Sequence, residues 1–281
     1  MTLAAFAQAV AREDEINLAQ ACLLIAQDAY PALDVGQYLD NIDRMALGLR
    51  SELPRGTAAE ERIGALNQFL FERLGYRGNT DDYYDPRNSY LNEVIDRKTG
   101  IPITLSVLYI EVGRRLGLPL EGVSFPGHFL VRVQVRGGVL VLDPFAGGLA
   151  QSEADLRSRL SRVIPEGVAA DVPVAELPLD QFLEPATKRE ILARVLRNLK
   201  AIYREKDKPE RLLQVLNRML VLTPEASSEL RDRGYVYQRL ECWRPALKDL
   251  TEYLEREPDA PDLEEVRASM MELKALCARM S

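Results

Sequence analysis

The only histidine of the chain, His128, lies in the segment VSFPGHFLVRV (123–133), where a β-strand is expected to begin. An imidazole takes up and releases protons near neutral pH, so this residue is the first candidate for a general base. A base of this kind needs a nucleophile, and the three thiols, Cys22, Cys242 and Cys277, are far apart in the sequence. A lone histidine is equally compatible with a half-buried structural side chain that bonds to the backbone.

The composition narrows the classes of function. The 43 acidic and 36 basic side chains leave a net charge of −7, which argues against general binding to nucleic acid or to anionic membranes. Three cysteines without a CxxC spacing predict neither a disulfide framework nor a zinc site, and no cofactor is expected. The acidic N-terminus lacks the features of a signal peptide, and no apolar run approaches the roughly 20 residues of a membrane span. A cytoplasmic protein is therefore expected.

Two predicted elements flank His128. The segment GIPITLSVLYIEVGRRLGLP predicts a helix over 104–116, with Pro102 in the turn that precedes it. That helix is nearly apolar around its first half and should be buried. After it the apolar period changes to two, and the segments FLVRVQV and VLVLD on either side of Gly137 and Gly138 predict a β-hairpin.

The register of this hairpin decides whether His128 can meet the carboxylate that ends the second strand. A two-residue turn at Gly137–Gly138 pairs Arg132 with Asp143. His128 would then lie four residues, about 13 Å, further along its strand, on the same face but out of contact. A longer turn or a bulge centred nearer Arg136 would be needed to join the two side chains.

The rest of the chain frames this region. The first 75 residues predict helices, one of them opening on Thr57 as a cap with Glu60 three residues later. The polar segment 76–99 predicts a loop whose tyrosines and acids either line a binding cleft or form a surface strap. A further helix is expected over 151–164. The Pro- and Ala-rich segment that follows is predicted to be a strap or a linker between two domains.

The last third repeats with a period of 34 residues, which relates Leu196 to Leu230, Tyr203 to Tyr237 and Pro224 to Pro258. This period resembles the tetratricopeptide repeat, with a final helix that covers the last apolar face. The alternative is a plain helical subdomain that only braces the core.

Several unusual segments occur in an order that resembles a known family. RRLGLPLEGVSFPGHFLVRV and DPF resemble the transglutaminase-like core, and together with YLNEVIDRKTGIPITLSVLYIEVG, LDPFAGG and the repeats they resemble the SirB-one family of bacterial proteins. In active enzymes of this kind a thiolate at a helix N-terminus works with a histidine and a carboxylate on the following strands. The resemblance therefore implies that His128 and Asp143 form a dyad.

The same resemblance places Pro102 where the cysteine belongs, and proline carries no nucleophile. The nearest hydroxyls are Thr104 and Ser106, which leave the direction of Pro102 by roughly 200° and 40° around a helix. Ser106 is the better substitute by angle but lies about 6 Å further along the axis. Both side chains can instead bond to helix carbonyls.

We therefore expect an α+β protein. Its parts are a transglutaminase-like domain with N-terminal helices and a small antiparallel sheet over 1–164, a linker over 165–189 and tetratricopeptide-like helices over 190–281. The favoured function is non-catalytic binding of a protein or peptide, with a regulatory role. The expected protein is a pseudoenzyme with a groove that has His128 at its floor and is lined by Tyr83, Tyr84, Asn92 and Pro102. The alternatives are a hydrolase or acyltransferase that uses Ser106 or Thr104 with His128 and Asp143, and a purely structural subunit. The oligomeric state is left open.

Overall fold

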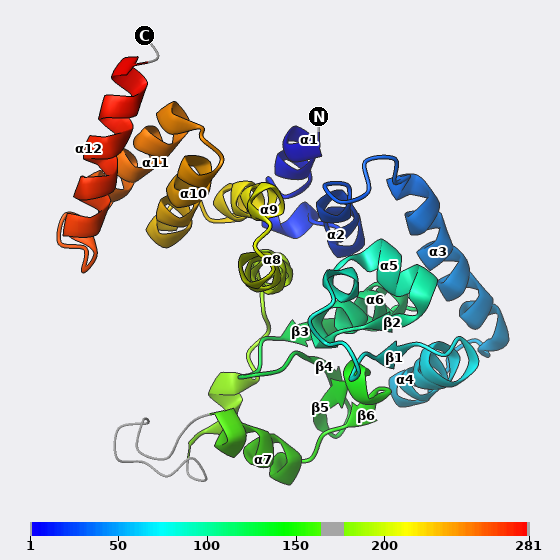
Figure 1. Cartoon of the computed structure of the whole chain (residues 1–281). Helices are drawn as coiled ribbons and strands as arrows, with labels where there is room; N and C mark the ends of the chain where they lie inside the picture. Colours follow the sequence, from blue (N-terminus) through cyan, green and yellow to red (C-terminus); the bar gives the residue numbers. More distant parts are fainter. Residues whose placement is uncertain (1, 164–176, 280–281) are drawn as a thin grey trace.

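The structure is a computed structural model that describes residues 2–163 and 177–279 (Figure 1). Residues 164–176, which include much of the predicted linker, lie outside the described part. Helices dominate, and a small antiparallel sheet lies beside them, as the α+β prediction requires. The helical segments before the central helix are α1 (Thr2–Ala9), η1 (Glu13–Glu15), α2 (Leu18–Ala26), α3 (Val35–Glu52), α4 (Ala59–Asn67), its π-helical continuation η2 (Gln68–Arg73), η3 (Pro86–Ser89) and α5 (Leu91–Arg97).

The central helix is α6 (Pro102–Arg115), whose first twelve residues are all buried. The apolar composition of PITLSVLYIEV leaves no polar stripe to face water, so neighbours cover the helix on every side. On one side lies a four-stranded antiparallel sheet in the order β3-β4-β5-β6, and on the others lie α2, α3 and α5. The strands are β3 (Leu120–Val123), β4 (Leu130–Val135), β5 (Gly138–Asp143) and β6 (Leu149–Ala150).

The predicted register of the β4–β5 hairpin was wrong. Arg132 pairs with Val141 rather than with Asp143, and Val135 pairs with Gly138, so the two-residue turn is Arg136–Gly137. Moving a two-residue turn back by one residue shortens the first strand by one residue and lengthens the second strand by one. Each residue of the first strand then pairs with a residue two positions earlier in the second strand. Continuing the observed register places Asp143 opposite Leu130, only two residues from His128.

Two local predictions before α6 also need correction. The side chain of Thr57 bonds to the carbonyl of Pro54 at 2.7 Å, and Ala58 is the residue that precedes α4, so Thr57 is not the predicted cap. The segment predicted as a loop contains α5 and the short parallel strands β1 (Arg77–Gly78) and β2 (Thr99–Gly100). The turn-forming polar residues of this segment, such as Asn79 and Asn88, gave a stronger signal for a loop than the short sequence of α5 gave for a helix.

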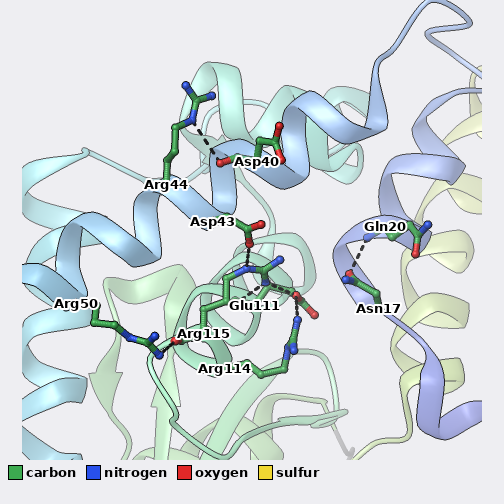
Figure 2. Close-up of polar contacts among 9 residues, drawn as sticks. All are labelled: Asn17, Gln20, Asp40, Asp43, Arg44, Arg50, Glu111, Arg114 and Arg115. Carbon is green, nitrogen blue, oxygen red and sulfur yellow. Dashed lines mark hydrogen bonds and ion pairs between the residues drawn. The ribbon is translucent and has the colours of Figure 1, made fainter.

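A charged network fastens α3 to the end of α6 (Figure 2). The buried carboxylate of Glu111 accepts hydrogen bonds from Arg114 at 3.2 Å and from Arg115 at 2.6 Å. Arg115 also pairs with Asp43 of α3, and Arg50 donates to the carbonyl of Arg115. A buried carboxylate needs such partners, so the network fixes how α3 covers α6.

The C-terminal helices pack in pairs, as the 34-residue period predicts. They are α8 (Lys188–Glu205) with α9 (Pro209–Leu222), then α10 (Ser227–Arg239) with α11 (Trp243–Arg256), and finally α12 (Leu263–Arg279). Within the sheet, η4 (Pro144–Ala146) connects β5 to β6, and α7 (Glu153–Val163) and η6 (Leu179–Phe182) lie between the sheet and the repeats in the sequence. The buried side chains of α8 and α9 belong to the same apolar cluster as α1, α2 and α6, whereas the core of α11 and α12 is separate. Figure 1 shows α8 and α9 between the N-terminal helices and α10–α12.

Candidate functional site

His128 lies in the turn that leads into β4. Gly127 has a φ of +68°, a conformation that favours glycine, and the backbone N–H of His128 donates to the carbonyl of Phe125 at 3.0 Å. This turn directs the ring toward the end of β5. There Nε2 of His128 lies 3.0 Å from Oδ1 of Asp143. The ring thus bonds to a carboxylate and not to the backbone, and its side chain stays 11% exposed.

Asp143 ends β5 and is completely buried. Its Oδ1 accepts the backbone N–H groups of Phe145 and Ala146 at 3.1 and 3.3 Å, while Oδ2 accepts Nη2 of Arg159 at 2.7 Å. A carboxylate that receives these donors is an acceptor toward the histidine as well, so Nε2 donates. In the neutral ring Nδ1 is then an acceptor, and it has no hydrogen-bond partner in the described part of the chain.

Arg159 is a site residue that the sequence reasoning missed. It comes from α7, which was predicted as a helix but without any chemical role. Its guanidinium supplies a positive charge that compensates the buried carboxylate of Asp143. A helix with arginines at 157, 159 and 162 gives no local signal that selects the second of them.

The residues at the start of α6 make no hydrogen bond to this dyad in the described structure. Pro102 is the first residue of the helix and is buried. The hydroxyl of Thr104 donates to the carbonyl of Asn88 at 2.7 Å and accepts the N–H of Ile101 at 3.2 Å, so it secures the helix start. The hydroxyl of Ser106 is buried without a hydrogen-bond partner, and neither hydroxyl bonds to His128 in the described structure.

The thiols are elsewhere. Cys22 is buried in α2, and burial, with a further contribution from Glu111, raises its pKa to about 12. Such a thiol is protonated at neutral pH and is a poor nucleophile. Cys242 precedes α11 and Cys277 lies in α12, both in the repeat region.

Beside the dyad lies a row of aromatic rings, which we call the aromatic patch: His128, Phe145, Tyr83 and Tyr84. Successive ring centroids are 6.0, 6.3 and 5.4 Å apart, each pair meeting edge to face. Tyr83 and Tyr84 are 39% and 62% exposed, which is unusual for such large side chains.

Local contacts hold the patch in place. The amide of Asn88 donates to the carbonyls of Asp82 and Tyr83 at 2.7 and 3.2 Å, which fixes the loop that carries the tyrosines. The ring of Phe145 lies over Gly78, where a Cβ atom would come within 2.5 Å of it. Asn92, predicted beside these tyrosines, lies in α5 with 4% exposure, and its Oδ1 has no partner in the described structure. It presents almost no surface to a ligand.

Residues 2–163 and 177–279 contain neither a candidate metal-binding cluster nor a candidate membrane span. No group of three or more His, Cys, Asp or Glu side chains there is arranged to hold a metal ion. No helix in those residues is long and apolar enough to cross a membrane.

Comparison with known proteins agrees with this architecture. Residues 36–197 match the model of the transglutaminase-like superfamily, and residues 199–271 match that of the tetratricopeptide repeat. A UPF0162 protein of Xylella fastidiosa is 44% identical over 93% of this chain and 91% of its own length. The UPF0162 protein YchA of Escherichia coli is 28% identical over 89% and 88% of the two chains.

Protein SirB1 of Salmonella typhimurium is 27% identical over 82% of this chain and 83% of its own length. The crystal structure of menin matches 96% of this chain and 74% of its own with a TM-score of 0.38 and 10% identity, a likeness too weak to support an argument. The family match covers more than half of the chain and agrees with the buried helix, the antiparallel sheet and the repeats described above. The chain therefore belongs to the transglutaminase-like superfamily, in the group of bacterial proteins that includes SirB1 and the UPF0162 proteins.

Proposed function

We propose that this protein is a non-catalytic member of its superfamily that binds a protein partner through an extended peptide segment laid on the aromatic patch. The observation that carries the proposal is the exposed pair Tyr83–Tyr84, continuous through Phe145 with the ring of His128. Tyrosines give large contact areas with few rotatable bonds, and they are enriched where proteins recognise one another. We further propose that this binding has a regulatory role and that it takes place in the cytoplasm.

The groups at the start of α6 support binding rather than covalent chemistry. Acyl transfer requires a nucleophile within hydrogen-bonding reach of its base. Pro102 offers none, the hydroxyl of Thr104 is engaged by backbone groups, and the hydroxyl of Ser106 makes no hydrogen bond to His128 in the described structure. The dyad His128–Asp143 is then a remnant that shapes one end of the patch.

The tetratricopeptide helices support the same class of function. Repeats of this kind present extended surfaces to other proteins, and α8 connects them to the core that carries the patch. A partner in contact with both parts would bury more area than the patch alone provides.

The proposal is tested by selecting peptides from a random-peptide phage library on the immobilised full-length protein and measuring their Kd by fluorescence polarisation. Tyr84→Ala should weaken the selected peptides by about tenfold or more, because an exposed aromatic anchor is removed without disturbing the core. Met271→Ala is the matched control, since Met271 is an equally exposed apolar side chain on α12. Peptides that bind Tyr84→Ala and wild type alike would refute binding at the patch.

The enzymatic alternative is tested in parallel with p-nitrophenyl acetate and with the selected peptides as substrates. On our proposal wild type and His128→Ala turn them over equally slowly, at the background rate. Turnover by wild type that His128→Ala abolishes, with an unchanged melting temperature, would establish an enzyme instead. The purely structural alternative predicts no Tyr84-dependent peptide and no turnover.

A further inference from the structure

Arg194, in the first half of α8, is the one partly buried arginine in residues 2–163 and 177–279 with neither a hydrogen bond nor an ion pair. Two other arginines of the repeats have carboxylate partners: Arg218 pairs with Asp28 at 2.5 Å and Arg233 with Asp249 at 2.6 Å. No guanidinium nitrogen of Arg194 is a fully buried atom without a partner, so the group stays open to an acceptor from outside the chain.

The surroundings of Arg194 are positive. Arg197 follows one turn later on the same side of α8, is exposed, and also has no ion pair in the described structure. No acidic residue occurs in α8 between Glu190 and Glu205. Burial and the charge of Arg197 both lower the pKa of Arg194. The two arginines thus form a local positive edge on a chain whose net charge is negative.

This edge adjoins the aromatic patch. α8 packs against η3, the turn that begins two residues after Tyr84. Burial raises the pKa of Tyr83, and the charge of Arg194 opposes that rise, so the two side chains interact electrostatically. The guanidinium of Arg194 thus acts electrostatically on Tyr83, the ring that lies between Phe145 and Tyr84 in the aromatic patch.

We propose that Arg194, assisted by Arg197, binds a carboxylate of the partner, so that the patch selects a peptide with an aspartate or glutamate beside an apolar residue. A guanidinium presents a planar pair of donors that matches a carboxylate and prefers it to a neutral amide. The apolar neighbour packs on Tyr83 and Tyr84. This inference rests on the proposed function, because it assigns the chemistry of the peptide that the patch receives.

The experiment is a double-mutant cycle on the full chain. A phage-selected peptide is synthesised with its acidic residue and with the corresponding amide, and both are titrated against wild type and Arg194→Gln. The amide should weaken binding to wild type about tenfold. It should change binding to Arg194→Gln less than about twofold, because the partner of the carboxylate is already gone. Arg136→Gln, which removes an exposed and unpaired arginine from the β4–β5 turn, is the matched control and should behave like wild type.

The possible results separate the two proposals. Peptides that depend on Tyr84 but lack an acidic preference, or whose acid is not coupled to Arg194, would overturn this inference and leave the proposed function standing. A selection that yields no Tyr84-dependent peptide would overturn the proposed function and this inference with it.

Thermal stability gives a readout independent of any peptide. Because Arg194 has no partner to lose, Arg194→Gln should melt at the wild-type temperature or higher, whereas Arg233→Gln should melt lower, since it leaves Asp249 buried and unpaired. A fall in melting temperature for Arg194→Gln as large as for Arg233→Gln would assign Arg194 a structural role and overturn the proposal.

Discussion

At the residue scale, the carboxylate of Asp143 connects three elements that are separate in the sequence. It accepts the ring of His128 before β4, the N–H groups of η4 and the guanidinium of Arg159 on α7. The carboxylate thus holds the turn, the strand end and the helix together. Positioning and stability are thus served by the same hydrogen bonds.

Removing that carboxylate should be costly. Asp143→Ala leaves His128 and Arg159 without their shared acceptor, and we expect a loss of about 3 kcal/mol in the free energy of unfolding. Urea unfolding followed by circular dichroism measures it. Asp259→Ala, at an exposed residue of the repeats with no ion pair in the described structure, is the control and should cost less than about 0.5 kcal/mol. Equal effects of the two changes would mean that the dyad contributes nothing to the fold.

A second prediction at this scale tests whether Pro102 stands where a nucleophile would. Pro102→Cys places a thiol at the first turn of α6, where the helix dipole and His128 would lower its pKa. The variant should acquire one thiol that reacts with iodoacetamide faster than any in wild type. The additional change His128→Ala should slow that reaction about tenfold or more. A thiol indifferent to His128 would show that Pro102 does not face the ring.

At the element scale, ion pairs between α8 and α10 link the first repeat to the second. The ammonium of Lys200 lies 2.5 Å from Glu229 and 2.7 Å from Asp232, and Arg204 also pairs with Asp232. Lys200 and both carboxylates are largely buried, so the pairs are poorly screened by solvent. Burial by itself would raise the pKa of Asp232, but Lys200 and Arg204 outweigh it and lower that pKa.

This lowered pKa predicts an acid dependence of stability. The carboxylate of Asp232 contributes stability that is complete above its unfolded-state pKa of about 3.9 and that disappears as the pH falls through the lower folded-state value. Asp232→Asn should therefore destabilise the protein by about 1 kcal/mol at neutral pH and by progressively less toward about pH 3. Urea unfolding at several pH values measures both proteins. A difference that does not change with pH would place the effect in packing rather than in charge.

At the scale of the whole molecule, the apolar core does not follow the boundary suggested by the sequence. Buried residues of α8 and α9, such as Leu196 and Leu216, belong to the cluster that includes α2 and α6. Arg218 of α9 is buried against Asp28, with its guanidinium 4.8 Å from the ring centroid of Phe6 in α1. The division of the chain at about residue 190 stays a prediction about its organisation, and we propose that the first repeat completes the core of the preceding domain.

Truncation tests this proposal. A chain of residues 1–226 keeps α8 and α9 and should unfold in one cooperative transition, at a lower temperature than the full chain because the face of α9 that contacts α10 is exposed. A chain of residues 1–187 loses both helices, exposes the core and should lack a cooperative transition. Circular dichroism melting distinguishes the two. Comparable cooperative melting of both truncated chains would mean that the repeats are an independent unit.

The sequence by itself determined the elements in which the spacing of apolar residues is regular. The apolar run of α6, the alternation of the hairpin strands and the 34-residue repeat predicted those structures, because each pattern depends on neighbours along the chain. The family followed from the resemblance of several whole segments and not from these periods. The resemblance to the transglutaminase-like core also placed Pro102 at the position of the nucleophile, and that placement stays a prediction.

Only the tertiary structure decided the contacts of the site. The His128–Asp143 hydrogen bond depends on a turn displaced by one residue, and two adjacent glycines leave that choice to packing. Arg159 reaches Asp143 and Arg194 lies near Tyr83 because helices distant in sequence pack against the loop and strand ends. Side chains of one type look alike in a sequence. Burial and the presence or absence of a counter-ion distinguish them, and both are properties of the folded molecule.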